Sequence, residues 1–224
     1  MDDTLIGAPL FAALDADAAD ALRASMVEVT LEKGDVIFAE GEPGDRLFVV
    51  IDGKIKLGHA SSDGRESLLA VLGPGEMFGE LSLFDPGART ATATALTDST
   101  VAGLGRPALR PWLTGRPEVA ETLLTALAQR LRRTNEAMAD LVFSDVPGRV
   151  AKALLDLGDK FGEETAEGLS VTHDLTQEEL AQLVGASRET VNKALADFAG
   201  RGWIQLESRS VVLLDVERLR RRAD

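Results

Sequence analysis

The chain has 224 residues, enough for two modest domains or one large one. It contains no cysteine, which excludes iron–sulfur clusters, disulfides and the usual structural zinc sites. Its formal net charge of -13 leaves little basic surface for neutralising phosphates. The N-terminal residues Met1–Leu5 lack the pattern of a signal peptide and no apolar run is long enough to span a bilayer, so we expect a cytoplasmic protein with no membrane partner.

The first part of the chain has the pattern of a small β-rich domain. Helix-forming residues with apolar spacing over 9–26 predict a short leading helix. From Val27 to about Arg106, β-rich runs alternate with turns that contain glycine, which predicts a small antiparallel roll or barrel. Examples of these runs are Val36–Phe38, Leu47–Ile51, Ile55–Leu57, Leu68–Leu72 and Thr92–Leu96.

A long helix is predicted from Pro117, since proline is tolerated in a first helical turn. Residues at alternating steps of four and three then form a heptad seam, which is typical of a helix that pairs with its counterpart in a second subunit. The seam consists of Ala120, Leu124, Leu127, Leu131, Thr134, Met138 and Leu141. Packing against the chain's own roll is the alternative. Thr134, with Asn135 beside it, is polar, which indicates that a ligand reaches the dimer interface.

The sequence Asp145–Gly148 breaks the long helix, and another amphipathic helix is predicted to follow as far as about Phe161. Residues Glu163–Gly168 have the composition of an exposed loop. Near the C-terminus, two β-rich runs, Trp203–Leu206 and Val211–Leu214, predict a hairpin that forms a wing. We therefore expect three segments: a β-roll domain with its leading helix at 1–116, a dimerisation helix and hinge at 117–144, and a winged helix-turn-helix domain at 145–224.

Between these elements the sequence predicts a helix-turn-helix. Thr176 and Glu179 form a capping box that begins one short helix, and Gly185 ends it with the backbone freedom that a tight turn needs. Ser187 caps the next helix, whose first turns carry charged groups suited to base edges. An ordinary helical hairpin is the alternative. The candidate DNA-binding residues are Thr176, Gln177, Ser187, Arg188, Glu189, Thr190 and Lys193.

The charges are unevenly distributed along the chain. Residues up to Phe143 include 13 basic and 22 acidic side chains, a net -9, and the rest include 11 and 15, a net -4. We therefore expect DNA binding through a few placed cations rather than a basic surface. The terminal arginines could contact phosphates or simply form a solvated helix end, and the second is the simpler interpretation; they are Arg218, Arg220, Arg221 and Arg222.

Within the roll, Gly79-Glu80-Leu81-Ser82 is followed closely by Arg89-Thr90. Glycine allows a ligand to approach the backbone, and a short helical turn offers free N–H groups to an anion. Arg89 supplies the planar fork that matches a phosphate, and Glu80 an acceptor for a sugar hydroxyl. These residue types suit a ribose phosphate. A plain Glu80–Arg89 salt bridge across a turn is the alternative.

Four phrases, together with the order of the segments, resemble the cyclic-AMP receptor protein branch of the bacterial Crp/Fnr transcription regulators, and especially its actinobacterial members. The resemblance covers essentially the whole chain and implies an α+β fold: an N-terminal antiparallel, jelly-roll-like, cyclic-nucleotide-binding β-roll, a long dimerisation helix and a C-terminal winged helix-turn-helix. The phrases are Glu42-Pro43-Gly44-Asp45-Arg46-Leu47, Phe78-Gly79-Glu80-Leu81-Ser82, Asp145-Val146-Pro147-Gly148-Arg149-Val150 and Ser187-Arg188-Glu189-Thr190-Val191.

The resemblance implies a homodimer that binds cAMP as an allosteric ligand, binds palindromic double-stranded promoter DNA and contacts RNA polymerase. Glu80 would accept the ribose 2′-hydroxyl and Arg89 would bind the phosphate. Arg188, Glu189 and Lys193 would reach base edges, although many relatives carry arginine where this chain has Lys193. The implied lining of the cyclic phosphate and ribose is Gly79, Leu81 and Ser82, and that of the purine is Thr90, Thr134 and the partner subunit's Asn135.

Other interpretations use the same elements. A regulator of the same superfamily could respond to cGMP or haem, or act largely without ligand; haem would have only His59 and His173 as histidine ligands. A nucleotide sensor that does not bind DNA would leave the helix-turn-helix unexplained. A cupin-like metalloenzyme needs several ligands on one metal, and the roll contains a single histidine. We therefore expect no catalytic residues, no metal and no resident cofactor.

Overall fold

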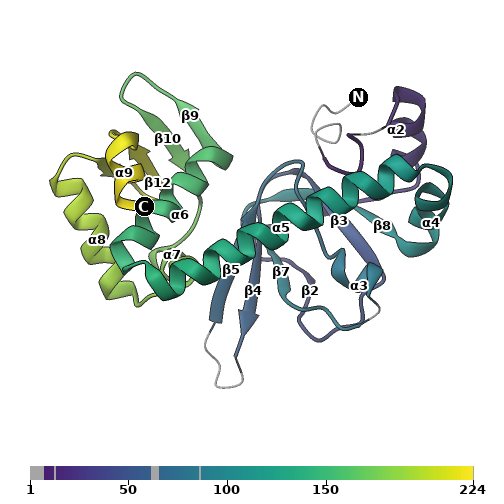
Figure 1. The fold of residues 1–224 in the computed structure, drawn as a ribbon, viewed down its shortest axis with the longest axis horizontal. Helices are drawn as coiled ribbons and strands as arrows, with labels where there is room; N and C mark the ends of the chain where they lie inside the picture. The colour runs from purple at the N-terminus through teal and green to yellow at the C-terminus, as the bar shows by residue number, and fades with distance from the viewer. Residues whose placement is uncertain (1–7, 13, 62–65, 86, 224) are drawn as a thin grey trace. The chain divides into compact units, whose positions relative to one another are not determined.

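The computed structural model describes residues 8–12, 14–61, 66–85 and 87–223 (Figure 1). The predicted acidic N-terminus, Met1–Leu5, lies outside these ranges. The chain divides into two compact units, one made of residues 1–60 and 70–133 and the other of residues 61–69 and 134–224. Helix α5, Pro117–Phe143, contributes residues to both.

Strands β1 to β8 form two four-stranded sheets, in agreement with the predicted antiparallel roll, and all their residues belong to the first unit except 66–69 of β5. One has the order β1-β8-β3-β6 and the other β2-β7-β4-β5, and the pairs β1–β8, β3–β8, β3–β6, β2–β7 and β4–β7 are antiparallel. The strands are β1 (Val27–Leu31), β2 (Val36–Phe38), β3 (Arg46–Asp52), β4 (Ile55–Ala60), β5 (Glu66–Leu72), β6 (Met77–Phe78), β7 (Thr92–Ala95) and β8 (Ser99–Gly105).

Both sheets contribute to one apolar core. Phe38 from β2 meets Phe48 from β3 and Phe78 from β6, with ring centroids 5.4–6.0 Å apart. Their packing is the aromatic arrangement expected of a well-filled interior. Val50 and Ile55 are fully buried in the same cluster. This core holds the short strand β6 in place and thereby positions the glycine-rich segment that follows it.

Helices cover the other face of the first sheet. Helix α2 (Ala16–Arg23) is shorter than the leading helix predicted over 9–26, because the Asp15 side chain accepts a hydrogen bond from Ala18 N and starts the helix there. Helix α4 (Arg106–Gly115) was not predicted. Figure 1 shows α2 and α4 near the start of α5, and Leu22, Leu109 and Val119 share one buried cluster with Leu104 from β8.

Helix α5 begins at Pro117, as predicted, and buries Val119 and Leu123. The heptad seam lies on a different face, and most of its apolar side chains are exposed in the single chain: Leu124 by 65%, Leu131 by 62%, Met138 by 63% and Leu141 by 57%. Such a row of exposed large apolar residues on one helix marks an interaction surface.

The second unit contains helices α6 (Val146–Phe161), α7 (Gln177–Val184), α8 (Arg188–Gly200) and α9 (Val216–Ala223). Its sheet has the order β11-β12-β10-β9, and all its pairs are antiparallel. The predicted wing is present as β11 (Ile204–Leu206) and β12 (Ser210–Leu213). The predicted loop Glu163–Gly168 is shorter than expected, since Glu163 and Glu164 belong to strand β9 (Gly162–Glu164), which pairs with β10 (Leu169–Thr172).

The break between α5 and α6 is narrower than the predicted Asp145–Gly148. Asp145 caps α6 by accepting a hydrogen bond from Gly148 N at 2.9 Å, so Val146, Pro147 and Gly148 form the first turn of α6. Ser144 and Asp145 are therefore the residues outside both helices.

Candidate functional site

The segment that follows β6 combines a left-handed glycine with a short helix. Gly79 has φ 74°, and a Cβ there would lie 2.7 Å from Arg89 Nη1, so both the backbone and the space require glycine. Helix α3, Leu81–Phe84, follows immediately, as the predicted helical turn requires. The segment thereby brings its backbone against the guanidinium of Arg89.

Arg89 is buried, with 6% of its surface exposed. Its Nη1 donates to Gly79 O at 2.7 Å and to Ser82 Oγ at 2.9 Å, and its Nη2 donates to Arg46 O at 2.9 Å. The guanidinium also lies over the Phe38 ring, 4.0 Å from the centroid. These contacts fix the plane of the guanidinium without neutralising its charge.

Among the residues described, no carboxylate forms an ion pair with Arg89, and its Nε is buried without a hydrogen-bond partner. Burial lowers the pKa of the Arg89 guanidinium from its usual value, and the largest opposing influence is the charge of Asp45. Buried charges in proteins are normally paired. A buried cation with no ion-pair partner in the described chain, beside a glycine-rich segment, has the chemistry needed to bind an anion.

Glu80 pairs with a residue that sequence reasoning missed. It is 1% exposed, and its Oε1 accepts a hydrogen bond from Arg130 Nη1 of α5 at 2.8 Å. Its Oε2 is buried and has no partner in the described part of the chain. The alternative of a Glu80–Arg89 salt bridge is therefore wrong. Arg130 lies four residues before Thr134, on the same helix face, and that spacing could have identified it.

Glu80, Arg89 and Arg130 line one hollow, together with Thr90 and Ala91. Its volume is about 30 Å³, which is small for a ligand site. Six of the predicted effector residues line it: Gly79, Glu80, Leu81, Ser82, Arg89 and Thr90. Thr134 and Asn135 are exposed on α5 and are not among its lining residues. Their contact with the effector stays a prediction.

In the second unit, the helix-turn-helix is formed as the capping pattern predicts. Thr176 Oγ1 accepts from Glu179 N at 3.1 Å while Glu179 Oε2 accepts from Thr176 N at 2.8 Å, which completes the capping box. Gly185 is left-handed, with φ 70° and ψ 43°. Ser187 Oγ accepts from Thr190 N at 3.3 Å and caps α8. The apolar residues predicted to pack between the two helices are buried: Leu180, Ala181, Val184, Val191 and Leu195.

Arg149 ties the turn to α6, a role that sequence reasoning missed. Its guanidinium donates to Ser144 O at 2.8 Å, to Val184 O at 3.1 Å and to Gly185 O at 3.2 Å. One side chain thus satisfies carbonyls at the end of α7 and at the start of α6. Arg149 belongs to the motif Asp145–Val150 that carries part of the family resemblance, and this could have drawn attention to it.

The predicted base-reading face of α8 is exposed, and its charges contact one another. Lys193 Nζ donates to Glu189 Oε1 at 2.7 Å, and both side chains are more than 70% exposed. Arg188 donates to Gln177 Oε1 at 3.3 Å. All seven predicted DNA-binding residues are exposed: Thr176, Gln177, Ser187, Arg188, Glu189, Thr190 and Lys193. These residues lie at the N-terminal ends of α7 and α8. Because they are exposed, their side chains can leave their present hydrogen-bond partners and contact another molecule at little cost.

Three of the terminal arginines form ion pairs. Arg218 pairs with Asp215 and Arg220 with Glu217 along α9. Arg222 donates to both oxygens of Asp145, at 2.6 and 2.7 Å. These pairs favour the solvated helix end over phosphate contact.

The histidines have ordinary roles. His59 Nδ1 lies 2.8 Å from Glu40 Oε1, and the buried His173 accepts a hydrogen bond from Leu175 N through Nδ1. The part of the chain that the structure describes contains no group of three residues placed to hold a metal ion. Nor does any helix within it have the length and apolar character needed to cross a membrane.

Comparison with known proteins accounts for both units. Residues 28–114 match the cyclic nucleotide-binding domain family, and residues 148–222 match the Crp-like helix-turn-helix domain family. Over 223 residues, and the full length of both proteins, the chain is 57% identical to a CRP-like cAMP-activated global transcriptional regulator of Mycobacterium tuberculosis. The chain belongs to the Crp/Fnr family of transcription regulators.

Two further relatives agree with this membership. The cyclic AMP receptor protein of Thermus thermophilus is 36% identical over 214 residues, which cover 93% of this chain and 96% of that protein. The solved structure of FixK2 from Bradyrhizobium japonicum superposes with a TM-score of 0.80 at 25% identity, covering 89% of this chain and 98% of that one. The predicted α+β fold of β-roll, long helix and winged helix-turn-helix is therefore confirmed.

Proposed function

We propose that this chain is a homodimeric, cAMP-responsive regulator that binds palindromic promoter DNA. The observation that carries the proposal is the buried guanidinium of Arg89, which has no ion-pair partner among the described residues and lies beside a buried carboxylate with one unpartnered oxygen. A ligand that offers both a phosphate and a neighbouring hydroxyl satisfies both groups at once. The cyclic phosphate and ribose of a cyclic nucleotide have this combination.

The relatives support cAMP as the ligand, since one is named a cAMP-activated regulator and another a cyclic AMP receptor protein. Arg89 and Ser82 would bind the phosphate, and Glu80 would accept the 2′-hydroxyl. Thr90 lines the hollow and offers a hydroxyl that suits adenine or guanine. Cyclic GMP is therefore the alternative to test beside cAMP.

Binding requires the hollow to open, because about 30 Å³ holds little more than one water molecule. Arg130 is a partly exposed part of this wall: 41% of its side-chain surface is exposed, while its partner Glu80 is buried. A ribose hydroxyl that donates to Glu80 Oε2 would share this carboxylate with Arg130, which donates to Oε1. Ligand binding would thereby act directly on α5.

The exposed heptad seam on α5 supports a homodimer. Pairing with a second α5 would bury Leu124, Leu131, Met138 and Leu141, whose apolar surface otherwise faces water. Thr134 and Asn135 lie in or next to this seam, so a purine read by them would lie where the subunits meet. The ligand would shift the dimer between arrangements only to the extent that it binds one of them more tightly.

DNA binding would place α8 in the major groove. Arginine and lysine suit guanine O6 and N7, and a carboxylate accepts from cytosine N4, which assigns base contacts to Arg188, Glu189 and Lys193. In a symmetric dimer the two helices would meet half-sites about one turn, roughly 34 Å, apart. We further infer a cytoplasmic protein that contacts RNA polymerase and has no catalytic activity.

The deciding experiment measures binding of the full chain to a labelled palindromic promoter fragment at fixed salt, without nucleotide, with cAMP and with cGMP. We expect cAMP to increase DNA affinity and cGMP to increase it less. Equal DNA affinity in all three conditions, together with no calorimetric binding of either nucleotide, would contradict the proposal.

The same measurement tests the switch. Thr134→Ala and Asn135→Ala should reduce the ratio of DNA affinities with and without cAMP, while the unfolding temperature stays close to that of the wild type. Thr125→Ala is the matched control, because Thr125 is an exposed residue of the same helix and does not line the hollow. An unchanged ratio in both variants would remove Thr134 and Asn135 from the coupling.

A further inference from the structure

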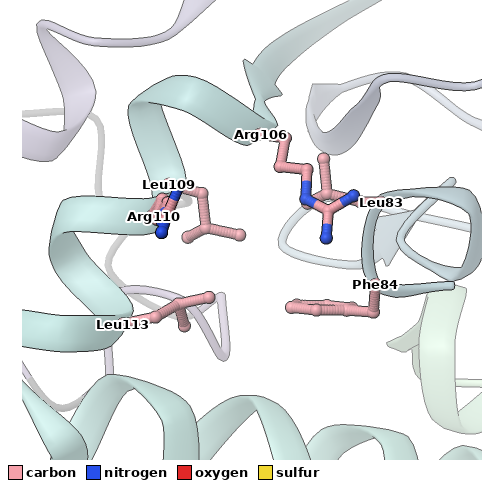
Figure 2. Close-up of a pocket in the computed structure, with 6 residues that line it drawn as sticks. All are labelled: Leu83, Phe84, Arg106, Leu109, Arg110 and Leu113. Atoms are coloured by element: carbon pink, nitrogen blue, oxygen red, sulfur yellow. The ribbon is translucent and has the colours of Figure 1, made fainter. Parts of the chain in front are cut away.

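A second and larger hollow lies on the first unit, between α3 and α4. Its volume is about 430 Å³, within the range of roughly 300–1,000 Å³ typical of small-molecule sites. Figure 2 shows Leu109 and Leu113 of α4 facing Phe84 of α3 across the gap, with Arg106 on the α3 side. Its lining is completed by Leu83 and Arg110. None of these six residues lines the nucleotide hollow.

The apolar wall is partly open to water. Leu83 and Leu109 are almost fully buried beneath it, whereas Phe84 is 38% exposed and Leu113 is half-buried. Four large apolar side chains thus surround a space that a hydrocarbon chain could fill. Removing this surface from water would favour binding of such a ligand.

The two arginines of the hollow are exposed and four residues apart on α4, which places them on one face of the helix. Neither guanidinium forms an ion pair or hydrogen bond with any residue that the structure describes. This is unusual in a chain with 37 acidic and 24 basic residues. Like charges at this spacing destabilise a helix slightly unless an anion joins them.

The start of α4 adds to the positive potential. Arg106 is the first residue of α4, and the N-cap, Gly105, gives no side-chain hydrogen bond; Arg106 N donates to Asp45 O at 3.1 Å, and Pro107 has no N–H. The positive end of the helix dipole therefore lies beside Arg106. An anionic group near Arg106 and Arg110 would meet both guanidinium groups and this helix end.

We propose that this hollow binds an aliphatic carboxylate, with the carboxylate at Arg106 and Arg110 and the hydrocarbon chain between Phe84 and the α4 leucines. Guanidinium groups match carboxylates in geometry and charge, and the apolar lining matches the chain. The site is separate from the nucleotide hollow, although α3 contributes to both: Leu81 and Ser82 face one, and Leu83 and Phe84 the other.

The test is calorimetric titration of the full chain with dodecanoate below its aggregation concentration. We expect saturable binding, and at least roughly tenfold weaker binding of dodecanol and of a dodecyl trimethylammonium salt, which keep the chain but lose or reverse the charge. The double variant Arg106→Gln/Arg110→Gln should weaken dodecanoate binding by a similar factor. Phe84→Ala should weaken dodecanoate and dodecanol alike.

Two control variants separate this site from its surroundings. Arg116→Gln changes an arginine of the same helix region that pairs with Asp15 and does not line the hollow, so dodecanoate affinity should stay unchanged. Arg89→Gln should also leave it unchanged, which makes the result independent of the proposed nucleotide site. Thermal unfolding of each variant checks the fold.

Three results would overturn the proposal. The first is equal affinity for dodecanoate and dodecanol. The second is unchanged dodecanoate affinity in the folded Arg106→Gln/Arg110→Gln variant. The third is no binding of dodecanoate, whether or not an acidic amphipathic peptide binds this hollow instead.

Discussion

The proposed nucleotide hollow and the proposed DNA-reading face of α8 both contain arginine or lysine and glutamate, but they hold these charges in opposite ways. In the hollow, Arg89 and Glu80 are at least 94% buried, and they do not pair with each other. On α8, Lys193 and Glu189 are 74% and 78% exposed and pair directly. The hollow buries polar groups that lack a partner in the described chain, whereas α8 exposes to water two charges that pair with each other.

This difference determines how each site can respond to a partner. A buried charge without a partner is costly, and a ligand that pairs with it recovers a large interaction. An exposed ion pair is worth only about 0.2–1 kcal/mol, so it can open to contact a base at little cost. We therefore expect substitutions in the hollow to change ligand affinity strongly, and substitutions on α8 to change sequence preference more than stability.

The largest effect is expected for Arg89→Gln. The amide can keep one backbone hydrogen bond but loses the charge that would meet the phosphate, so cAMP affinity should fall by about 3 kcal/mol, more than a hundredfold. Calorimetry measures the affinity, and thermal unfolding checks the fold. Arg23→Gln, a surface arginine paired with Glu28, is the control. Unchanged cAMP affinity would show that the pocket has been misplaced.

Arg130→Ala tests whether Glu80 depends on its partner. The substitution leaves both buried carboxylate oxygens without the guanidinium, so the free energy of unfolding should fall by about 1–3 kcal/mol. Adding Glu80→Gln should restore part of this loss, because the uncharged amide needs no cation. Urea unfolding of the two single variants and the double variant gives the coupling energy. Strictly additive losses would mean that the pair does not stabilise the fold.

Glu189→Ala tests the exposed pair. The change should relax base preference at one position of each half-site by about 1–3 kcal/mol, and stability should barely change. Binding-site selection at fixed salt measures the preference, and Arg201→Ala, at the far end of α8 and paired with Asp197, is the control. A uniform loss of affinity with the same base preference would show that Glu189 does not read sequence.

The smallest effect is expected at Asp145. Hydrogen bonds from Arg222, and then from Gly148 N, hold the pKa of the Asp145 carboxyl below its usual 3.8. Because the folded-state pKa is lowered, this carboxylate stabilises the fold above the usual pKa, and the contribution is lost as the pH falls through the lowered value. Asp145→Asn keeps a capping side chain, so it should lower the unfolding temperature slightly at neutral pH and not at all in strong acid. An equal difference at every pH would contradict this.

Local sequence signals predicted the helix-turn-helix better than the β-roll. The capping box at Thr176, the left-handed Gly185 and the cap at Ser187 depend on neighbours within a few residues, and each is formed as predicted. Strands β1 and β8 lie in the predicted β-rich region but were not identified individually, and helix α4 was not predicted. Their stability comes from partners distant in the chain: β8 pairs with β1 and β3, and Leu109 of α4 packs beneath them.

The candidate nucleotide site shows the same division. The residue types Gly79, Glu80 and Arg89 indicated a ribose phosphate, because their chemistry does not depend on the fold. The sequence left open whether Glu80 and Arg89 pair with each other. The tertiary structure decided this: Arg130 of α5 donates to Glu80, while Arg89 donates to the backbone carbonyls of Gly79 and Arg46.

The sequence by itself determined the order of the segments, the start of the long helix at Pro117, the turn chemistry of the helix-turn-helix and the charged groups of both candidate sites. These follow from periodicity, capping and residue chemistry, which act over a few neighbours. Only the tertiary structure decided that Arg89 is a buried cation with no ion-pair partner in the described chain, and that Arg106 and Arg110 share a hollow with Phe84. Burial and ion pairing depend on residues far apart in the chain, and those become neighbours only when the sheets and helices pack.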